Sequence, residues 1–145
     1  MRITTYSDYS LRVLIYLATQ TENRVTIEQI AVAYGISHNH LTKVVHQLSR
    51  LGYVDSVRGK QGGLRLRCTP DAINLGVLLR ETETDMALVE CMGDDNRCMI
   101  NPVCNLKAVF TQALQAFLQV MDQYSLADIL PKHQQTQLRR LLQMA

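Results

Sequence analysis

The architecture of the chain follows from residues 35–52, which read GISHNHLTKVVHQLSRLG. Ser37 is placed to cap a helix, and the apolar residues behind it recur at helical spacing, at Leu41, Val44, Val45 and Leu48. Gly52 ends that pattern. Just upstream, Thr26 opens a capping-box signal for a shorter helix that Gly35 ends. Two short helices joined by a tight turn predict a helix-turn-helix.

The neighbouring segments complete a winged helix. A further amphipathic helix is expected to begin near Ser7. Residues 53–57 and 64–67 are strand-like, and between them lies the loop Arg58-Gly59-Lys60-Gln61-Gly62-Gly63. Its glycines permit a tight turn, and its two cations lie at the tip. The sequence therefore predicts a mainly helical fold with a winged helix-turn-helix over residues 1–70.

The second half of the chain differs in character. Residues 71–100 predict a short connecting helix at 73–80 and a polar loop. Residues 101–145 predict a dimerisation helix, opened by Asn101 and Pro102 and running to residue 124, and a helical tail from Ser125. The long helix would span about 34 Å, more than a small winged domain covers. We expect its apolar stripe to pack on a second copy, with the tail helping to close the dimer.

Composition and charge limit the function classes. A chain of 145 residues is too short for two independently folded enzyme domains. Its longest apolar run is about six residues, and no secretory signal is visible, so we expect a cytoplasmic protein with no membrane partner. Residues 1–67 carry nine Lys or Arg against four Asp or Glu, whereas the rest carries six against nine. The basic half is expected to meet a polyanion, and no motif typical of an enzyme is present.

The predicted DNA-binding surface combines the third helix with the wing. A helix that enters the major groove needs polar side chains near its N-terminus. Asn39 can pair with adenine, and Lys43 can reach guanine or phosphate, while the wing would add backbone or minor-groove contacts. The alternative is an ordinary protein-interaction surface. The residues predicted to contact double-stranded DNA are Ser37, His38, Asn39, His40, Thr42, Lys43, Arg58, Lys60, Gln61 and Arg65.

Three cysteines form the second candidate site. Cys91, Cys98 and Cys104 are separated by six and five residues. A structural zinc site usually has four ligands, often with cysteines two residues apart, and neither condition is met. Three thiols suit an iron–sulfur cluster with one non-cysteine ligand, and Cys104 is expected in the first helical turn, where the dipole favours a thiolate. Disulfide-forming sensor thiols, a zinc site and inert cysteines are the alternatives. Cys68 is expected to be a small buried residue.

Over nearly its whole length, the sequence resembles the iron–sulfur winged-helix transcriptional repressors. The resemblance is carried by the opening Thr5-Tyr6-Ser7-Asp8-Tyr9, by residues 35–40, by the loop at 58–63 and by the three cysteines ahead of a long helix. It implies a homodimer that binds a pseudo-palindromic operator and holds its cluster near the dimer interface.

Two branches of that family differ in the fourth ligand. The cluster-biogenesis branch has a histidine three residues past the last cysteine, where this chain has Lys107, whose charge would repel iron. The nitric-oxide-sensing branch uses an aspartate at the start of the partner chain's first helix, and Asp8 matches it. The first cysteine spacing is one residue longer than is usual in the family, which leaves Asp94 and Asp95 as replacements.

The resemblance therefore implies a repressor that senses nitric oxide through an iron–sulfur cluster and releases its operator on nitrosylation. We expect a [4Fe–4S] rather than a [2Fe–2S] cluster. The runner-up is a cluster-biogenesis or thiol-redox-sensing regulator of the same fold. A more remote alternative is an electron-transfer or cluster-carrier protein whose winged helix only contacts other proteins.

Overall fold

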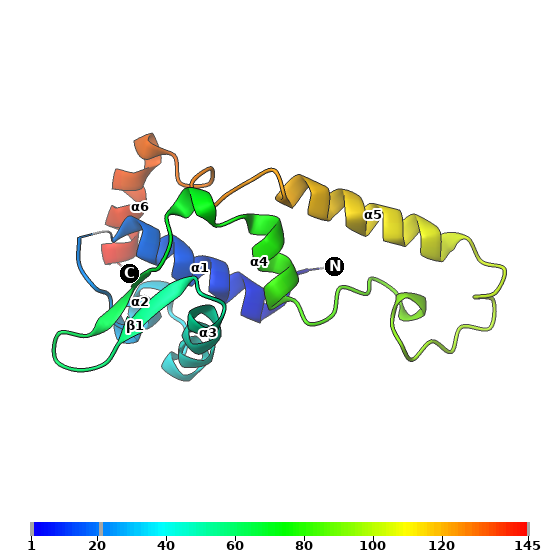
Figure 1. The fold of residues 1–145 in the computed structure, drawn as a ribbon, viewed down its shortest axis with the longest axis horizontal. Coiled ribbons are helices and arrows are strands. Elements are labelled where there is room, and N and C mark those ends of the chain that lie inside the picture. The colour runs from blue at the N-terminus through cyan, green and yellow to red at the C-terminus, as the bar shows by residue number, and fades with distance from the viewer. Residues whose placement is uncertain (1, 21, 145) are drawn as a thin grey trace.

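The computed structural model describes residues 2–20 and 22–144 and shows a winged-helix body from which one helix extends (Figure 1). The predicted mainly helical, winged helix-turn-helix fold is confirmed. In chain order the elements are α1 Thr5–Thr19, α2 Ile27–Tyr34, α3 His38–Arg50, β1 Val54–Val57, β2 Gly63–Leu66, η1 Pro70–Ala72, α4 Leu75–Thr82, η2 Glu90–Met92, α5 Leu106–Met121 and α6 Lys132–Met144.

The helix-turn-helix begins and ends at the predicted caps. The Thr26 hydroxyl accepts the Gln29 backbone N–H at 3.2 Å, and the Gln29 side chain accepts the Thr26 N–H at 2.8 Å. Gly35 ends α2 with φ of 62°, a left-handed conformation that glycine adopts without strain. The Ser37 hydroxyl then accepts the His40 N–H at 3.4 Å and opens α3.

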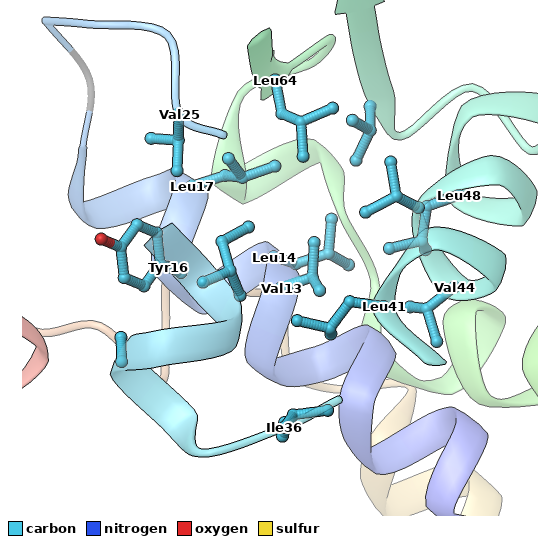
Figure 2. Packing of buried hydrophobic residues seen from close by; sticks show 14 of the residues in the cluster. Val13, Leu14, Tyr16, Leu17, Val25, Ile36, Leu41, Val44, Leu48 and Leu64 are labelled. Atoms are coloured by element: carbon cyan, nitrogen blue, oxygen red, sulfur yellow. The ribbon is translucent and has the colours of Figure 1, made fainter. Parts of the chain in front are cut away.

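Helix α1 runs through the centre of the body. It begins at Thr5, two residues before the predicted start, because the Thr4 hydroxyl accepts the Ser7 N–H at 3.3 Å. Figure 2 shows its apolar side chains pointing toward those of α3 and the hairpin. Burying each such side chain contributes about 1.5–3 kcal/mol. The core residues labelled there are Val13, Leu14, Tyr16, Leu17, Val25, Ile36, Leu41, Val44, Leu48 and Leu64.

The predicted wing is a two-stranded antiparallel hairpin. Val54 lies opposite Leu66, and Val57 lies opposite Gly63. The segment ahead of α2 adds a short third connection, because Val25 and Leu64 exchange backbone hydrogen bonds of 3.0 and 2.7 Å. The basic turn at 58–62 therefore projects from a base that is anchored to the helix-turn-helix.

The long helix is shorter than predicted. It runs from Leu106 to Met121, about 24 Å, whereas the sequence suggested residues 101–124. Asn101 does not cap it; its carbonyl accepts the Cys104 N–H at 3.4 Å within a turn. Consequently Cys104 lies before the helix and not in its first turn. No residue of α5 is buried, and Figure 1 shows the helix extending away from the body.

The C-terminal tail packs on its own body. The Ser125 N–H donates to Asp128 at 2.7 Å, as the capping signal suggests, but turns follow, and α6 begins only at Lys132. Helix α6 contacts α1 and α2, and its Leu142 is buried. The structure thus places the tail against its own winged helix, where the sequence suggested a role in closing the dimer. Within the described residues, no helix is both long and apolar enough to cross a bilayer.

A polar lock fixes the end of α5 to α4. Arg80 makes two hydrogen bonds to the Asp122 carboxylate, at 2.5 and 2.8 Å, and the Asn74 side chain donates to the Asp122 carbonyl at 2.7 Å. The hydrogen bonds from Arg80 lower the pKa of Asp122. Gly76 faces this lock so closely that a Cβ atom there would lie 2.0 Å from an Asp122 carboxylate oxygen.

Replacing Gly76 with alanine is expected to displace the Asp122 side chain and lower the free energy of unfolding. The gain in helix propensity is at most about 1 kcal/mol, while overpacking costs about 1–3 kcal/mol. Gly93→Ala is the matched control, because its nearest contact would be an ordinary 3.6 Å from the Glu90 carbonyl. Denaturant unfolding of both variants measures the difference, and a Gly76→Ala protein as stable as Gly93→Ala would contradict the lock.

Candidate nucleic-acid interface and metal-binding segment

Helix α3 lies beside the hairpin (Figure 1), and its outer face is polar. Its four inward positions are buried, as the sequence predicts. Ser37, which caps the helix, is exposed. The hydroxyl of Thr42 donates to the His38 carbonyl at 2.9 Å. An exposed polar helix face next to a basic turn can follow a DNA groove and its phosphates. The outer-face residues, all exposed, are His38, Asn39, His40, Thr42, Lys43 and His46.

The wing contributes exposed charge at its tip and a paired arginine at its base. Arg58, Lys60 and Gln61 are all exposed on the turn. Arg65 is engaged within the hairpin, because its Nε lies 2.9 Å from an Asp55 carboxylate oxygen. Any phosphate contact by Arg65 therefore competes with Asp55 for the guanidinium.

Arg24 supports the wing from outside the hairpin, and no sequence motif marks it for this role. It donates to the Gly63 carbonyl at 3.3 Å and lies 3.6 Å from Asp55. It therefore braces the wing against the segment ahead of α2. Its contacts are with residues about 30 to 40 positions away in sequence, so no local pattern reveals them.

The predicted ligand Asp8 is paired within its own helix. Its carboxylate lies 2.8 Å from the Arg12 guanidinium, and both side chains are about 40% exposed. The same guanidinium lies over two rings, 5.8 Å from the centroid of Tyr9 and 5.7 Å from that of Tyr34. The i,i+4 spacing of Asp8 and Arg12 is visible in the sequence, whereas the two ring contacts are not.

These contacts connect Asp8 to the helix-turn-helix. Tyr34 is the last residue of α2, and the Tyr9 ring lies 6.4 Å from the His40 ring at the start of α3. Burial raises the pKa of Tyr34 to about 12, so its ring stays neutral beside Arg12 at physiological pH. Through these two rings, the position of Arg12 affects the turn between α2 and α3 and the first residues of α3.

The three cysteines lie in the irregular segment between α4 and α5. Cys91 is in η2, Cys98 follows a turn in which Asn96 accepts its N–H at 3.0 Å, and Cys104 lies two residues before α5. All three are free thiols and half-buried. Among the residues that the structure describes, no three His, Cys, Asp or Glu side chains are grouped closely enough to hold a metal ion.

The donor set fits an iron–sulfur cluster, but one chain does not assemble it. Thiolates are the usual ligands of such clusters, and these three are accessible to a ligand. Figure 1 shows the segment at the far end of α5, away from the start of α1, where Asp8 lies. The structure therefore brings Asp8 to Arg12 and not to the cysteines of its own chain. Asp94 and Asp95 lie in the same segment as the cysteines, and both are exposed.

Cys68 has a different environment. It packs against the hydrophobic core, but it is half-buried where the sequence predicts a buried residue. Burial raises the pKa of its thiol, which opposes thiolate formation.

The fold and the outer face of α3 define a winged helix-turn-helix DNA-binding protein. A family profile described as "Rrf2: Iron-dependent Transcriptional regulator" matches residues 3–132. The chain is 51% identical over 144 residues to the HTH-type transcriptional regulator NsrR of Bacillus licheniformis, covering 98% of this chain and 99% of that protein. It is 50% identical over 131 residues to NsrR of Bacillus subtilis, covering 89% and 90%.

The fold also matches those of solved structures of transcriptional regulators. CymR, the global cysteine regulator of B. subtilis, matches with a TM-score of 0.71 at 29% identity, covering 89% of this chain and 95% of that one. T. potens IscR matches with a TM-score of 0.72 at 27% identity, covering 90% and 86%. The chain belongs to the Rrf2 family, as an NsrR-like transcriptional regulator that binds DNA and represses transcription.

Replacing Lys43 with alanine is expected to weaken operator binding by about 1–3 kcal/mol if the side chain reads a base. Lys43 is exposed on the outer face of α3, so the fold should not change. Lys132→Ala at the start of α6 removes the same charge away from this face and is the control. Fluorescence anisotropy with an operator duplex measures both, and equal affinities would contradict the assignment of α3 as the recognition helix.

Proposed function

We propose that the chain acts as a homodimeric repressor that binds a pseudo-palindromic operator and releases it in response to nitric oxide, sensed through an iron–sulfur cluster. The proposal is carried by three free, half-buried cysteines in a chain that is 51% identical to a regulator named NsrR. Two copies of α3 related by a two-fold axis would read two half-sites, which is why the operator should be a pseudo-palindrome.

The exposed helix α5 supports dimer formation. None of its residues is buried, and the apolar residues Leu106, Val109 and Val120 are each more than half exposed. An apolar helix face of this kind marks an interaction surface, and a closed two-fold pair buries the same face of both copies. In an antiparallel pair, the cysteine segment at the N-terminal end of one α5 lies toward α4 and α1 of the other copy.

This arrangement supports a ligand set drawn from both copies. Cys91, Cys98 and Cys104 of one copy would bind the cluster, which we propose is [4Fe–4S], and Asp8 of the other copy would complete its coordination. Asp8 is 40% exposed, so its carboxylate is accessible to a second copy. When bound, the cluster would supply iron that reacts with nitric oxide.

Asp8 would transmit the signal by changing the group that its carboxylate binds. In this structure its carboxylate holds Arg12, and Arg12 lies against the rings of Tyr9 and Tyr34. A carboxylate engaged by the second copy would release Arg12, and a carboxylate returned to Arg12 would restore the present contacts. Because Tyr9 lies against His40, the start of α3 would move with this exchange. A tenfold loss of operator affinity requires only about 1.4 kcal/mol.

Absorbance and iron–sulfide analysis of protein purified without oxygen tests the proposal. We expect a broad visible band, iron and sulfide in comparable amounts, and loss of the band when nitric oxide is added. Protein that stays colourless after attempted cluster reconstitution would overturn the proposal and favour sensing by thiols or zinc, while the DNA-binding assignment would stand.

The Cys98→Ala variant is expected to lose the visible band and keep its fold. Cys98 lies outside the hydrophobic core, in a segment whose backbone bonds are turns, so unfolding of the body should be unaffected. Cys68→Ser is the control, because that thiol packs on the core away from the segment and should leave the band intact. Spectra and thermal unfolding of both variants give the comparison, and a Cys98→Ala protein with a full cluster would contradict the ligand set.

A further inference from the structure

An apolar hollow of about 450 Å³ lies between α4, α5 and the start of the chain. Its walls include Ile3, Leu79, Met86, Leu88, Phe110 and Phe117. Glu83 also lines it, and the carboxylate of Glu83 accepts the Thr4 N–H at 2.8 Å. Because Thr4 caps α1, the hollow lies next to the helical turn that carries Asp8.

The cysteine segment carries apolar side chains that nothing in its own chain covers. Met99 is 95% exposed, Ile100 is 61% exposed and Val103 is 84% exposed. All three lie between Cys98 and Cys104. Such exposure is unfavourable for a monomer and indicates a surface that is covered in an assembly.

We propose that Met99, Ile100 and Val103 of one copy dock in the hollow of a second copy. The hollow of each chain is lined by Met86 and Leu88 from the start of its own cysteine segment and not by Met99, Ile100 or Val103. Figure 1 shows that the later part of the segment leads to the end of α5 that lies far from the body. Antiparallel pairing through the N-terminal part of α5 would place Leu106 and Val109 near the two-fold axis, and the segment over the partner's hollow. The contact is formed twice, once in each direction.

This inference rests on the proposed dimer and gives it a specific contact. The hollow is lined by Ile3 and Glu83, which adjoin the cap of α1. Docking would therefore hold Cys98 and Cys104 of one copy toward Asp8 of the other. The apolar contact would position the cysteines even before any metal is bound, so it can be measured in metal-free protein.

Mixed dimers of two variants test this docking. The loop variant is Ile100→Asp and the hollow variant is Ile3→Asn, so either homodimer lacks both loop–hollow contacts. A mixed dimer keeps one intact contact, between the loop of the hollow variant and the hollow of the loop variant. Sedimentation in reductant and chelator measures the dimer dissociation constant without a cluster. Val32→Asp on α2 is the matched control, because Val32 is 59% exposed and distant from the segment.

We expect each variant homodimer to dissociate about tenfold more readily than the wild type. The dissociation constant of the mixed dimer should lie between that of the wild type and those of the two variant homodimers. A mixed dimer as weak as both homodimers would overturn the proposal, because it would mean that each loop docks on its own chain. Unchanged dissociation of both variants would also overturn it and assign the hollow to another occupant, such as a small apolar molecule. Iron content of the same variants is measured separately, so failure of the docking is distinguishable from failure of cluster binding.

Discussion

The first turn of α1 is fastened to the end of α4 by two sets of hydrogen bonds. The Ser7 hydroxyl donates to that of Thr82 at 2.8 Å, and both side chains are buried. The Thr4 N–H and hydroxyl donate to one carboxylate oxygen of Glu83 at 2.8 and 3.0 Å. A buried hydroxyl that loses its partner costs about 1–3 kcal/mol. The turn that carries Asp8 is therefore held against the helix from which the cysteine segment departs.

The molecule has one part whose apolar side chains are buried within the chain and another part whose apolar side chains are left uncovered. The winged helix, α4 and α6 share one buried core, whereas α5 and the cysteine segment expose apolar side chains. The basic excess lies in residues 1–67, which form the winged helix. A second copy that covers α5 would also meet the fastened turn of α1. In the proposed dimer, assembly and DNA recognition would be coupled through α1, because α1 also packs on α3.

The caps at Thr26, Gly35 and Ser37 were predictable because each depends on a few neighbouring residues. The inward face of α3 and the hairpin followed from periodicity for the same reason. The start of α5 was mispredicted because Asn101 and Pro102 resemble a cap but lie in turns, and the helix begins only after Asn105. The position of α6 depends on packing against α1 and α2, which no local pattern encodes.

The pairing of Asp8 with Arg12 was visible as a spacing, whereas the contacts of Arg12 with two tyrosine rings required the fold. The site that the resemblance implies could be predicted only as a set of residues, because one chain holds its parts apart.

The most direct measurement compares operator affinity before and after nitric oxide for the wild type and for Asp8→Ala, both loaded with cluster. We expect the wild type to lose at least about tenfold in affinity. Asp8→Ala should show an altered spectrum and a much smaller change in affinity, because the shared site would lack its link to α1. The same spectrum, the same response to nitric oxide and the same operator affinity in both proteins would contradict the role of Asp8 in coupling the cysteine segment to DNA binding.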